Sequence, residues 1–213
     1  MLPNYDAKAV AEVLGLAFLR GSKDGSPASE AEKGRSTAPR GASDPDFVIH
    51  VDDAAMLMVE SKTKDTWAPF SASKASGGRL SGFESHVSSP SSILIEMAVE
   101  QGLPRKTLRH VAEWLAGGDT AKVSALEWGV VPKTTLERRE TKLSPQESER
   151  TERIARLFVH ARRALGTDAE ARAFMTAPHP ELDGRSPIDA AKSDLSTRRA
   201  EQILTALEYG LAL

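Results

Sequence analysis

Apolar residues recur at helical spacing through the second half of this chain, and glycine or proline punctuates the periodic segments. The spacing predicts helices over residues 93–101, 106–116, 120–128 and 133–140. Breaks follow the first three, at Gly102, at Gly117 with Gly118, and at residues 129–132. No segment in this half alternates with period two, so we expect an all-α fold with short connections there.

The sharpest helix boundary lies at Ser144, which precedes Pro145 and stands three residues before Glu147. A serine N-cap, a proline at the first helical position and a glutamate able to bond back to the cap together start a helix. Its apolar stripe consists of Ile154, Leu157, Phe158, Ala161 and Leu165. Further helices are expected over residues 168–176, just after 184–187 and over 196–209, the last with Ala200, Ile203, Leu204 and Leu207 on its inner face.

The first 91 residues are expected to form a flexible extension with a short helix and linkers. Residues 7–19 have an amphipathic helical pattern; the alternative of a signal peptide lacks a preceding basic stretch, and the run is too short to span a bilayer. Residues 21–46 and 71–92 are rich in serine, glycine and charge and offer little to bury. Periodicity does not separate helix from strand over residues 47–59, so any β structure is expected between residues 47 and 70.

Composition narrows the classes of function. The 28 basic and 30 acidic residues give a net charge of −2, so any DNA contact must come from a local patch. The absence of cysteine removes disulfides, thiolate catalysis and cysteine-bound zinc, and it suits a reducing compartment. We therefore expect a cytoplasmic protein with no membrane-spanning segment.

Motifs for enzymatic chemistry are weak. Ser71 and Lys74 have the spacing of a Ser-x-x-Lys nucleophile motif, but they lie in a serine-rich linker without its companion motifs. The five histidines are scattered without metal-binding spacing, and no phosphate-binding glycine loop is present. We expect no cofactor, no metal site and no enzymatic activity.

Three blocks in order carry a resemblance to a known family: LSPQESERTERIARLF from Leu143, PELDGRSPIDAA from Pro180, and AEQILTALEYGLAL from Ala200. Residues 143–213 resemble the toxin-binding domain of the Xre/MbcA/ParS antitoxins, the partners of RES-domain toxins. The preceding segments, EQGLPRKTLRHVAEWLA and LEWGVVPKTTLERRE, resemble the helix-turn-helix-like region of that family. The resemblance covers about the last 115 residues, and it divides the chain into an extension (1–91), a helix-turn-helix-like region (92–142) and a toxin-binding domain (143–213).

The resemblance implies an antitoxin of a type II toxin-antitoxin system that neutralises a RES-domain toxin by direct contact. The toxin would be the enzyme, consuming NAD or transferring ADP-ribose from it, and this chain its inhibitor. In the family the C-terminal end of the antitoxin approaches the active-site cleft of the toxin. The matching toxin-binding residues here are Glu208, Tyr209, Gly210 and Leu211.

Residue chemistry leaves alternatives open at these positions. The apolar terminus, 209–213, either meets a partner or folds back onto the helices, and the resemblance favours the partner. Arg185 of the LDGRSP block is a further candidate for toxin binding, where it could reach an acidic group. It could equally cap local carbonyls and pair with Asp183 or Asp189, and this local role is favoured because exposed pairs reveal little about function.

DNA binding is the second function considered, since this family often regulates its own operon. With Gly129 as the turn glycine, Ala125 lies where two helices touch, and the second helix carries four candidate DNA contacts: Lys133, Thr134, Arg138 and Arg139. The register is imperfect, because Thr135 falls on the buried position of the second helix and Leu136 comes one place late. Residues 104–142 carry an excess of three positive charges, which suits either a DNA-facing surface or an ordinary solvated one.

Two functions of different classes therefore remain, an antitoxin that possesses a toxin partner and a helix-turn-helix transcriptional regulator that lacks one. Operator DNA is a candidate partner in both. Antitoxins of this family usually self-associate, and an unpaired apolar face on the helices of residues 93–114 would serve, so a homodimer is expected.

Overall fold

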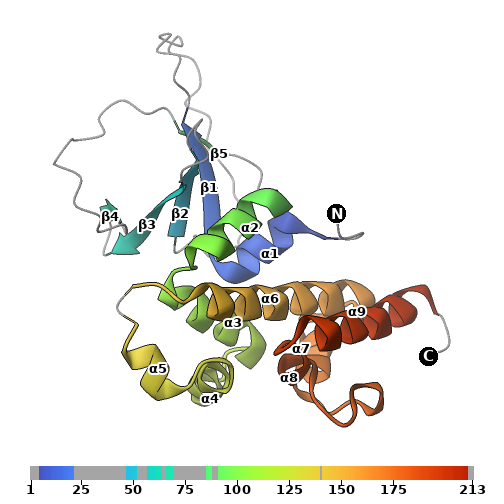
Figure 1. The fold of residues 1–213 in the computed structure, drawn as a ribbon. Coiled ribbons are helices and arrows are strands. Elements are labelled where there is room, and N and C mark those ends of the chain that lie inside the picture. The colour runs from blue at the N-terminus through green and yellow to red at the C-terminus, as the bar shows by residue number, and fades with distance from the viewer. Residues whose placement is uncertain are drawn as a thin grey trace. The chain divides into compact units, whose positions relative to one another are not determined.

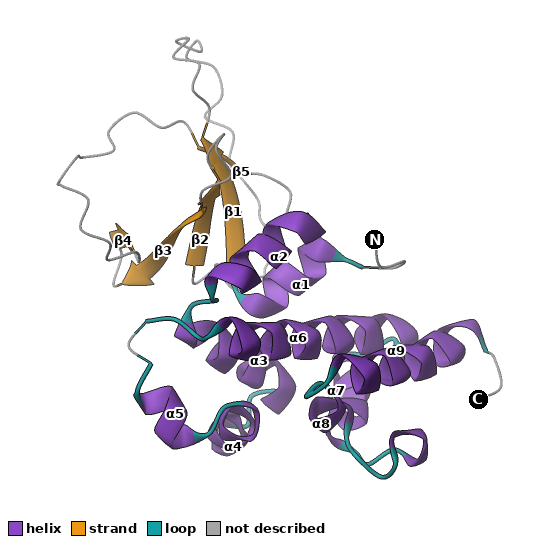
Figure 2. Cartoon of the chain, viewed as in Figure 1, coloured by secondary structure: helices purple, strands orange, loops and turns teal. Residues whose placement is uncertain are grey.

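The computed structural model describes residues 5–21, 47–51, 57–63, 66–69, 85–87, 91–139 and 141–210. The chain divides into two compact units, a helical unit made of residues 1–15 and 90–213 and a second unit made of residues 16–89. Figures 1 and 2 show helices throughout the first unit and strands in the second. The second unit is thus inserted in sequence between the first helix of the helical unit and the rest of it.

The inserted unit contains a five-stranded sheet in the order β4-β3-β2-β1-β5. Its strands are β1 (Leu16–Gly21), β2 (Phe47–Val51), β3 (Leu57–Thr63), β4 (Thr66–Pro69) and β5 (Ser85–Val87). β1 and β2 run parallel, with Leu16 opposite Phe47, and the other pairs are antiparallel. A parallel pair needs a long connection, which residues 22–46 supply.

This sheet corrects the interpretation of residues 1–91 as a flexible extension with one helix. Strands were expected only between residues 47 and 70, whereas β1 and β5 lie outside that range. The helix predicted over residues 7–19 ends at Leu14, because Gly15 adopts a left-handed conformation with φ 68° and β1 follows directly. Periodicity alone does not locate the boundary between a helix and a strand within one continuous apolar run, such as residues 7–19.

The helical unit confirms the all-α architecture expected for the second half of the chain. Its helices are α1 (Ala7–Leu14), α2 (Ser92–Gln101), α3 (Arg105–Ala116), α4 (Thr120–Val130), α5 (Lys133–Glu137), α6 (Pro145–Leu165), α7 (Asp168–Thr176), η1 (Pro180–Leu182), α8 (Pro187–Ala190) and α9 (Asp194–Tyr209). In the described part of residues 91–210, the β structure consists of one isolated bridge, between Pro104 and Lys142.

The long helix α6 runs through the middle of this unit, and the other helices pack along it (Figure 1). It begins as the sequence predicts: the Ser144 backbone N–H donates to the Glu147 carboxylate (2.7 Å), and the Glu147 N–H donates to Ser144 Oγ (3.3 Å). This capping box satisfies donors that the first helical turn leaves free. The predicted stripe is buried from Ile154 to Ala161, with no exposed surface on Phe158, while Leu165 at the end is half-buried.

Helix α1 belongs to the same core, although it precedes the inserted sheet in sequence. Asp6 caps its first turn by accepting from the Ala9 backbone N–H at 3.0 Å. Val10, Val13 and Leu14 then face α3 and α6 and have no exposed surface. The first helix is therefore part of the helical unit, and the boundary expected at residue 91 does not separate it from the core.

No helix in the described residues combines the length and the apolar character needed to cross a bilayer.

Candidate functional site

The last turn of α9 presents apolar side chains to solvent. The inner face of the helix is buried in its middle turns, with no exposed surface on Ala200 or Leu204. Leu207 was expected on this inner face but is 44% exposed, and Tyr209 is 60% exposed. Leu207 continues the apolar inner face of α9 but is left partly uncovered, and Gly210 closes the helix with φ 63°. Leu211 and the two residues after it lie outside the described residues.

Glu208 fastens this exposed turn to α6. Its carboxylate accepts two hydrogen bonds from Arg163, at 2.8 Å from Nε and 2.9 Å from Nη2, and lies 3.3 Å from His160 Nε2. The hydrogen bonds from Arg163 lower the pKa of Glu208 below its usual value. Burial and the nearby Arg163 lower the pKa of His160, which favours the neutral ring. Arg163 was not among the residues predicted from the sequence, although a cation in the last turn of a long helix is a recognisable signal.

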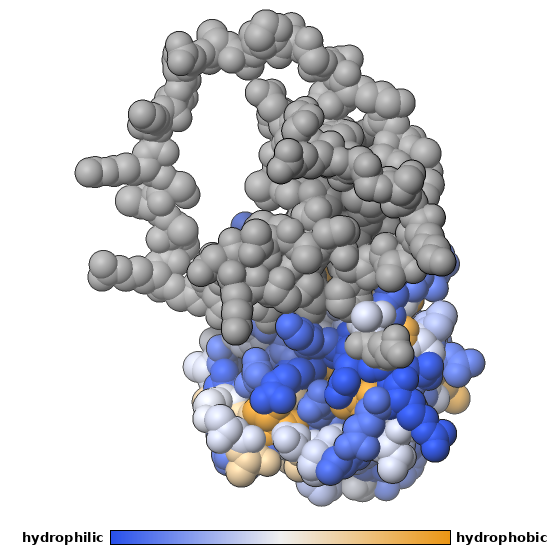
Figure 3. All heavy atoms as spheres, turned by 90° about the vertical axis from the view of Figure 1, so that its left-hand side faces the viewer, coloured by the Kyte–Doolittle hydropathy of each residue, from blue (hydrophilic) through white to orange (hydrophobic). Residues whose placement is uncertain are grey.

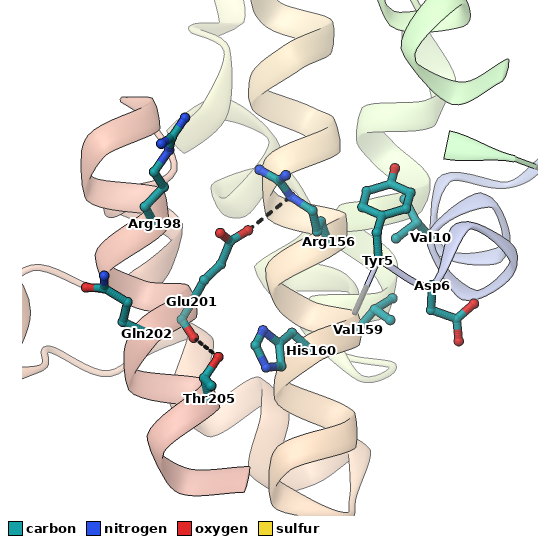
Figure 4. Close-up of a pocket in the computed structure, with 10 residues that line it drawn as sticks. All are labelled: Tyr5, Asp6, Val10, Arg156, Val159, His160, Arg198, Glu201, Gln202 and Thr205. Carbon is teal, nitrogen blue, oxygen red and sulfur yellow. Dashed lines mark hydrogen bonds and ion pairs between the residues drawn. The ribbon is translucent and has the colours of Figure 1, made fainter. Parts of the chain in front are cut away.

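A pocket of about 340 Å³ lies between α6, α9 and the residues before α1. Figure 4 shows Arg156 of α6 between Glu201 of α9 and Tyr5. Arg156 Nε lies 3.2 Å from Glu201 and 3.7 Å from Glu152, and the Tyr5 hydroxyl donates to Glu152 at 3.0 Å. One guanidinium thus serves two carboxylates, and burial raises the pKa of both Glu152 and Glu201. These ion pairs and the hydrogen bond from Tyr5 join three segments of the helical unit.

Arg185 adopts the local role expected for it. Its guanidinium donates to the Leu182 carbonyl (3.1 Å), to Asp183 (3.2 Å) and to Ser196 Oγ (3.3 Å), so its acidic partner is Asp183 rather than Asp189. Ser196 lies in the first turn of α9, thirteen residues before Tyr209, which corresponds to about 20 Å along a helix. The structure therefore brings Glu208, Tyr209 and Gly210 together at one end of α9 and holds Arg185 at the other.

Helices α4 and α5 form the helix-turn-helix pair, but their turn differs from the expected one. Gly129 lies inside α4, which continues to Val130, and the turn is made by Val131 and Pro132. Leu136, 2% exposed, occupies the buried position of α5, while Thr135 is half-buried. The imperfect register came from taking Gly129 as the turn glycine. Ala125, expected at the contact between the two helices, is exposed.

The four predicted DNA contacts lie in two different environments. Lys133, Thr134 and Arg138 are exposed on and just after α5. Lys133 lies 5.2 Å from the centre of the Trp128 ring and 3.9 Å from Glu137, and Arg138 makes no ion pair with the described residues. Figure 3 shows the side of the molecule where α4 and α5 lie; hydrophilic residues cover most of the described surface there, with apolar patches between them.

Arg139, the fourth, is half-buried and is held by an acidic partner. Its guanidinium donates to both oxygens of Glu147, at 3.1 and 3.0 Å, and its backbone carbonyl accepts from Arg105 Nη1 at 3.3 Å. This forked pair uses the same carboxylate that caps α6 and lowers the pKa of Glu147 despite its partial burial. The sequence indicated a cation here but not that an acid eight residues later would bind it.

Among the described residues, no three histidine, aspartate or glutamate side chains gather at a spacing that could hold a metal ion.

Comparison with known families gives two matches, both to antitoxin domains. The antitoxin Xre-like helix-turn-helix domain matches residues 95–156, which run from α2 into α6. The antitoxin Xre/MbcA/ParS C-terminal toxin-binding domain matches residues 160–210, from the end of α6 through α9. No curated protein matches the chain.

Each match contains one of the two surfaces described above, the exposed face of α5 and the end of α9. The helix-turn-helix match contains the exposed cations of α5, and the toxin-binding match contains the apolar end of α9 with Glu208 and Arg163. The interval between them falls inside α6, so one helix serves both matched domains. The chain therefore belongs to the Xre/MbcA/ParS-like antitoxins, which act in type II toxin-antitoxin systems.

Proposed function

We propose that this antitoxin neutralises a RES-domain toxin in the cytoplasm by inserting the end of α9 into the active site of the toxin. The toxin would be an enzyme that consumes NAD or transfers ADP-ribose from it. The observation that carries the proposal is the exposure of Leu207 and Tyr209 on the last turn of a helix whose inner face is buried in the middle turns. Exposed apolar side chains beside ordered polar groups are typical of partner surfaces.

The chemistry of this turn suits a tight interface. Tyr209 offers a large, rigid ring with a polar tip, the type of side chain that dominates binding energy at interfaces. Glu208 is held by Arg163 before any partner arrives, so little conformational freedom remains to be lost there. Gly210 closes the helix, and Leu211 follows it in sequence.

Arg185 has a subordinate place in the proposal, because about 20 Å of helix separates its partner Ser196 from Tyr209. A toxin that contacted both would have to cover the length of α9. Arg185→Ala tests this extent: loss of neutralisation would support a toxin that spans α9, and full neutralisation would limit the interface to the C-terminal end.

Co-expression with the protein encoded beside this antitoxin tests the main proposal. Growth, cellular NAD and co-purification are compared for the intact chain, a truncation after Leu207, Leu207→Ala and Tyr209→Ala. Leu195→Ala is the matched control, because Leu195 is a leucine of the same helix that is 81% exposed in its first turn.

We expect the truncation and Tyr209→Ala to lose rescue and co-purification while the control keeps both. Full rescue by the truncation would rule out the C-terminal contact. A neighbouring protein that stops growth without lowering NAD or attaching ADP-ribose would rule out the RES assignment and leave the antitoxin role in place.

A second function, binding to operator DNA, is favoured by the three exposed residues Lys133, Thr134 and Arg138 on and just after α5. We propose that they contact duplex DNA in the major groove, in the manner of a helix-turn-helix second helix. Titration with the DNA upstream of the antitoxin gene, against a scrambled duplex, tests this. The alternative of a transcriptional regulator without a toxin finds less support, since the toxin-binding match covers the last four helical elements.

We also propose a homodimer, with its contact at the start of α2. The apolar face expected to be free over residues 93–114 is largely covered by α1, α4 and α6, and Ile93, 59% exposed, is its most exposed apolar side chain. Sedimentation of Ile93→Asp beside the unmodified chain tests this contact; an unchanged mass in the variant would rule it out.

A further inference from the structure

The first two turns of α6 hold both helices of the helix-turn-helix. Arg150 lies in the second turn, and its guanidinium donates to two carbonyls at the end of α4, to Val130 through Nη1 and to Gly129 at 3.0 Å through Nη2. Glu147 lies in the first turn and binds Arg139, which follows α5. We call Glu147 and Arg150 the α6 clamp.

Arg150 is placed to act on the turn between α4 and α5. It makes no ion pair with the described residues; its charge is directed instead at carbonyls that the end of α4 leaves without helical partners. The planar guanidinium reaches two adjacent carbonyls at once, which a lysine ammonium cannot do in the same geometry. Val131 and Pro132 follow directly, so Arg150 binds the helix end that immediately precedes the turn into α5.

Helix α5 has little else to orient it. It contains five residues, of which Leu136 is buried, and a helix this short does not hold its shape alone. Its far end is fixed by the Arg139–Glu147 pair and by Arg105, which donates to the Arg139 carbonyl. A backbone bond from Leu143 to Leu103 at 2.9 Å closes the segment. The α6 clamp thus holds the residues on both sides of α5.

We propose that Glu147 and Arg150 are positioning residues for DNA recognition, orienting α5 for the major groove without touching DNA, and that Arg139 is part of this support rather than a DNA contact. The inference rests on the operator binding proposed above. It divides the cations near α5 into two groups. Lys133 and Arg138 contact DNA, whereas Arg139 and Arg150 hold the helix that carries them.

The two groups differ in a measurable property. Each phosphate contact releases condensed counterions, so its loss lowers the slope of binding against salt by about one unit. A positioning residue makes no phosphate contact, so its loss lowers specific affinity and leaves the slope unchanged. Misplacing α5 also removes the preference for operator over scrambled DNA, because base contacts depend on geometry and phosphate contacts depend mainly on charge.

The experiment measures fluorescence anisotropy of the full-length chain with a labelled duplex from the DNA upstream of its gene and with a scrambled duplex. Titrations run between about 50 and about 200 mM salt. The variants are Arg150→Gln, Arg150→Lys, Arg139→Gln, Arg138→Gln and Lys133→Gln. Arg153→Gln is the control, because Arg153 also lies in α6 and also donates to a backbone carbonyl, that of Ala191 at 3.4 Å. Binding to the toxin and thermal unfolding verify that each variant folds.

We expect Arg150→Gln and Arg139→Gln to lose about tenfold in operator affinity, with an unchanged salt slope and retained toxin binding. Arg150→Lys should recover part of the loss, and Arg138→Gln and Lys133→Gln should lower the slope. Unchanged operator affinity in Arg150→Gln overturns the clamp alone, and a lowered slope in Arg139→Gln returns Arg139 to the DNA surface. No specific binding by the unmodified chain overturns operator binding and the clamp together.

Discussion

Arg163 of α6 and Glu208 of α9 are joined by two parallel hydrogen bonds, 2.8 Å from Nε and 2.9 Å from Nη2, one residue before the exposed Tyr209. We predict that Glu208→Ala weakens toxin binding about tenfold, because the last turn of α9 would lose its attachment to α6 before binding. Stability should change by less than about 1 kcal/mol, since solvent-accessible ion pairs contribute little. Calorimetric titration with the toxin and thermal unfolding measure the two effects.

The control for this prediction is Glu113→Ala, which removes an ion pair of similar chemistry, 3.1 Å from Arg109, on a helix far along the sequence from α9. Toxin affinity should be unchanged in this variant. An equal loss in both variants would mean that the effect is general rather than local to α9.

A second prediction concerns the first helix. Leu14 has no exposed surface and lies in the core of the helical unit, so Leu14→Ala should cost about 2–5 kcal/mol in the free energy of unfolding. Urea denaturation measures this. Leu195→Ala, at a site 81% exposed, should change stability by less than about 0.5 kcal/mol. A cost for Leu14→Ala no larger than that of the control would mean that α1 does not belong to the core.

A third prediction concerns Glu152. Burial raises the pKa of its carboxyl group above the ordinary value of 4.5. Since the folded protein binds this proton more tightly than the unfolded chain, the stability it contributes is complete below pH 4.5 and is lost as pH rises through the folded pKa. Glu152→Gln removes this loss and keeps an acceptor for the Tyr5 hydroxyl. The variant should therefore gain stability relative to the unmodified chain as pH rises.

Urea denaturation of both proteins at about pH 4 and about pH 7.5 checks the sign. Glu149→Gln is the control, because Glu149 lies on the same helix with an exposed carboxylate. A stability difference between Glu152→Gln and the unmodified chain that shrinks or reverses with rising pH would contradict the raised pKa.

The fourth prediction addresses the start of α6. Ser144→Ala removes the hydroxyl that accepts from the Glu147 N–H at 3.3 Å, and it should cost about 1 kcal/mol in stability, as the loss of other serine caps does. Ser92→Ala, at the first position of α2 beside the true cap Ser91, should cost less than about 0.5 kcal/mol. Guanidinium denaturation compares the two, and equal costs would argue against the capping box as a source of stability.

Local sequence determined the features that depend on a few neighbouring residues. The capping box of Ser144 and Glu147 is complete within four residues, and the stripe from Ile154 to Ala161 lies on one face of whichever helix contains it. Both were predicted and both are confirmed. The three ordered sequence blocks also indicated the family, because motif and spacing are properties of the chain alone.

Tertiary structure decided what depends on neighbours distant in sequence. Leu207 continues the apolar face of α9, but only the packed structure shows that its side chain is left partly uncovered. The sequence predicts Arg139 as a DNA contact, but the fold places Glu147 beside it as an ion-pair partner. The sequence also predicts Gly129 as the turn residue, but α4 continues through it and its carbonyl accepts a hydrogen bond from Arg150. Periodicity fixes which face of a helix is apolar, whereas exposure and pairing depend on which surfaces meet it, and that is decided by packing.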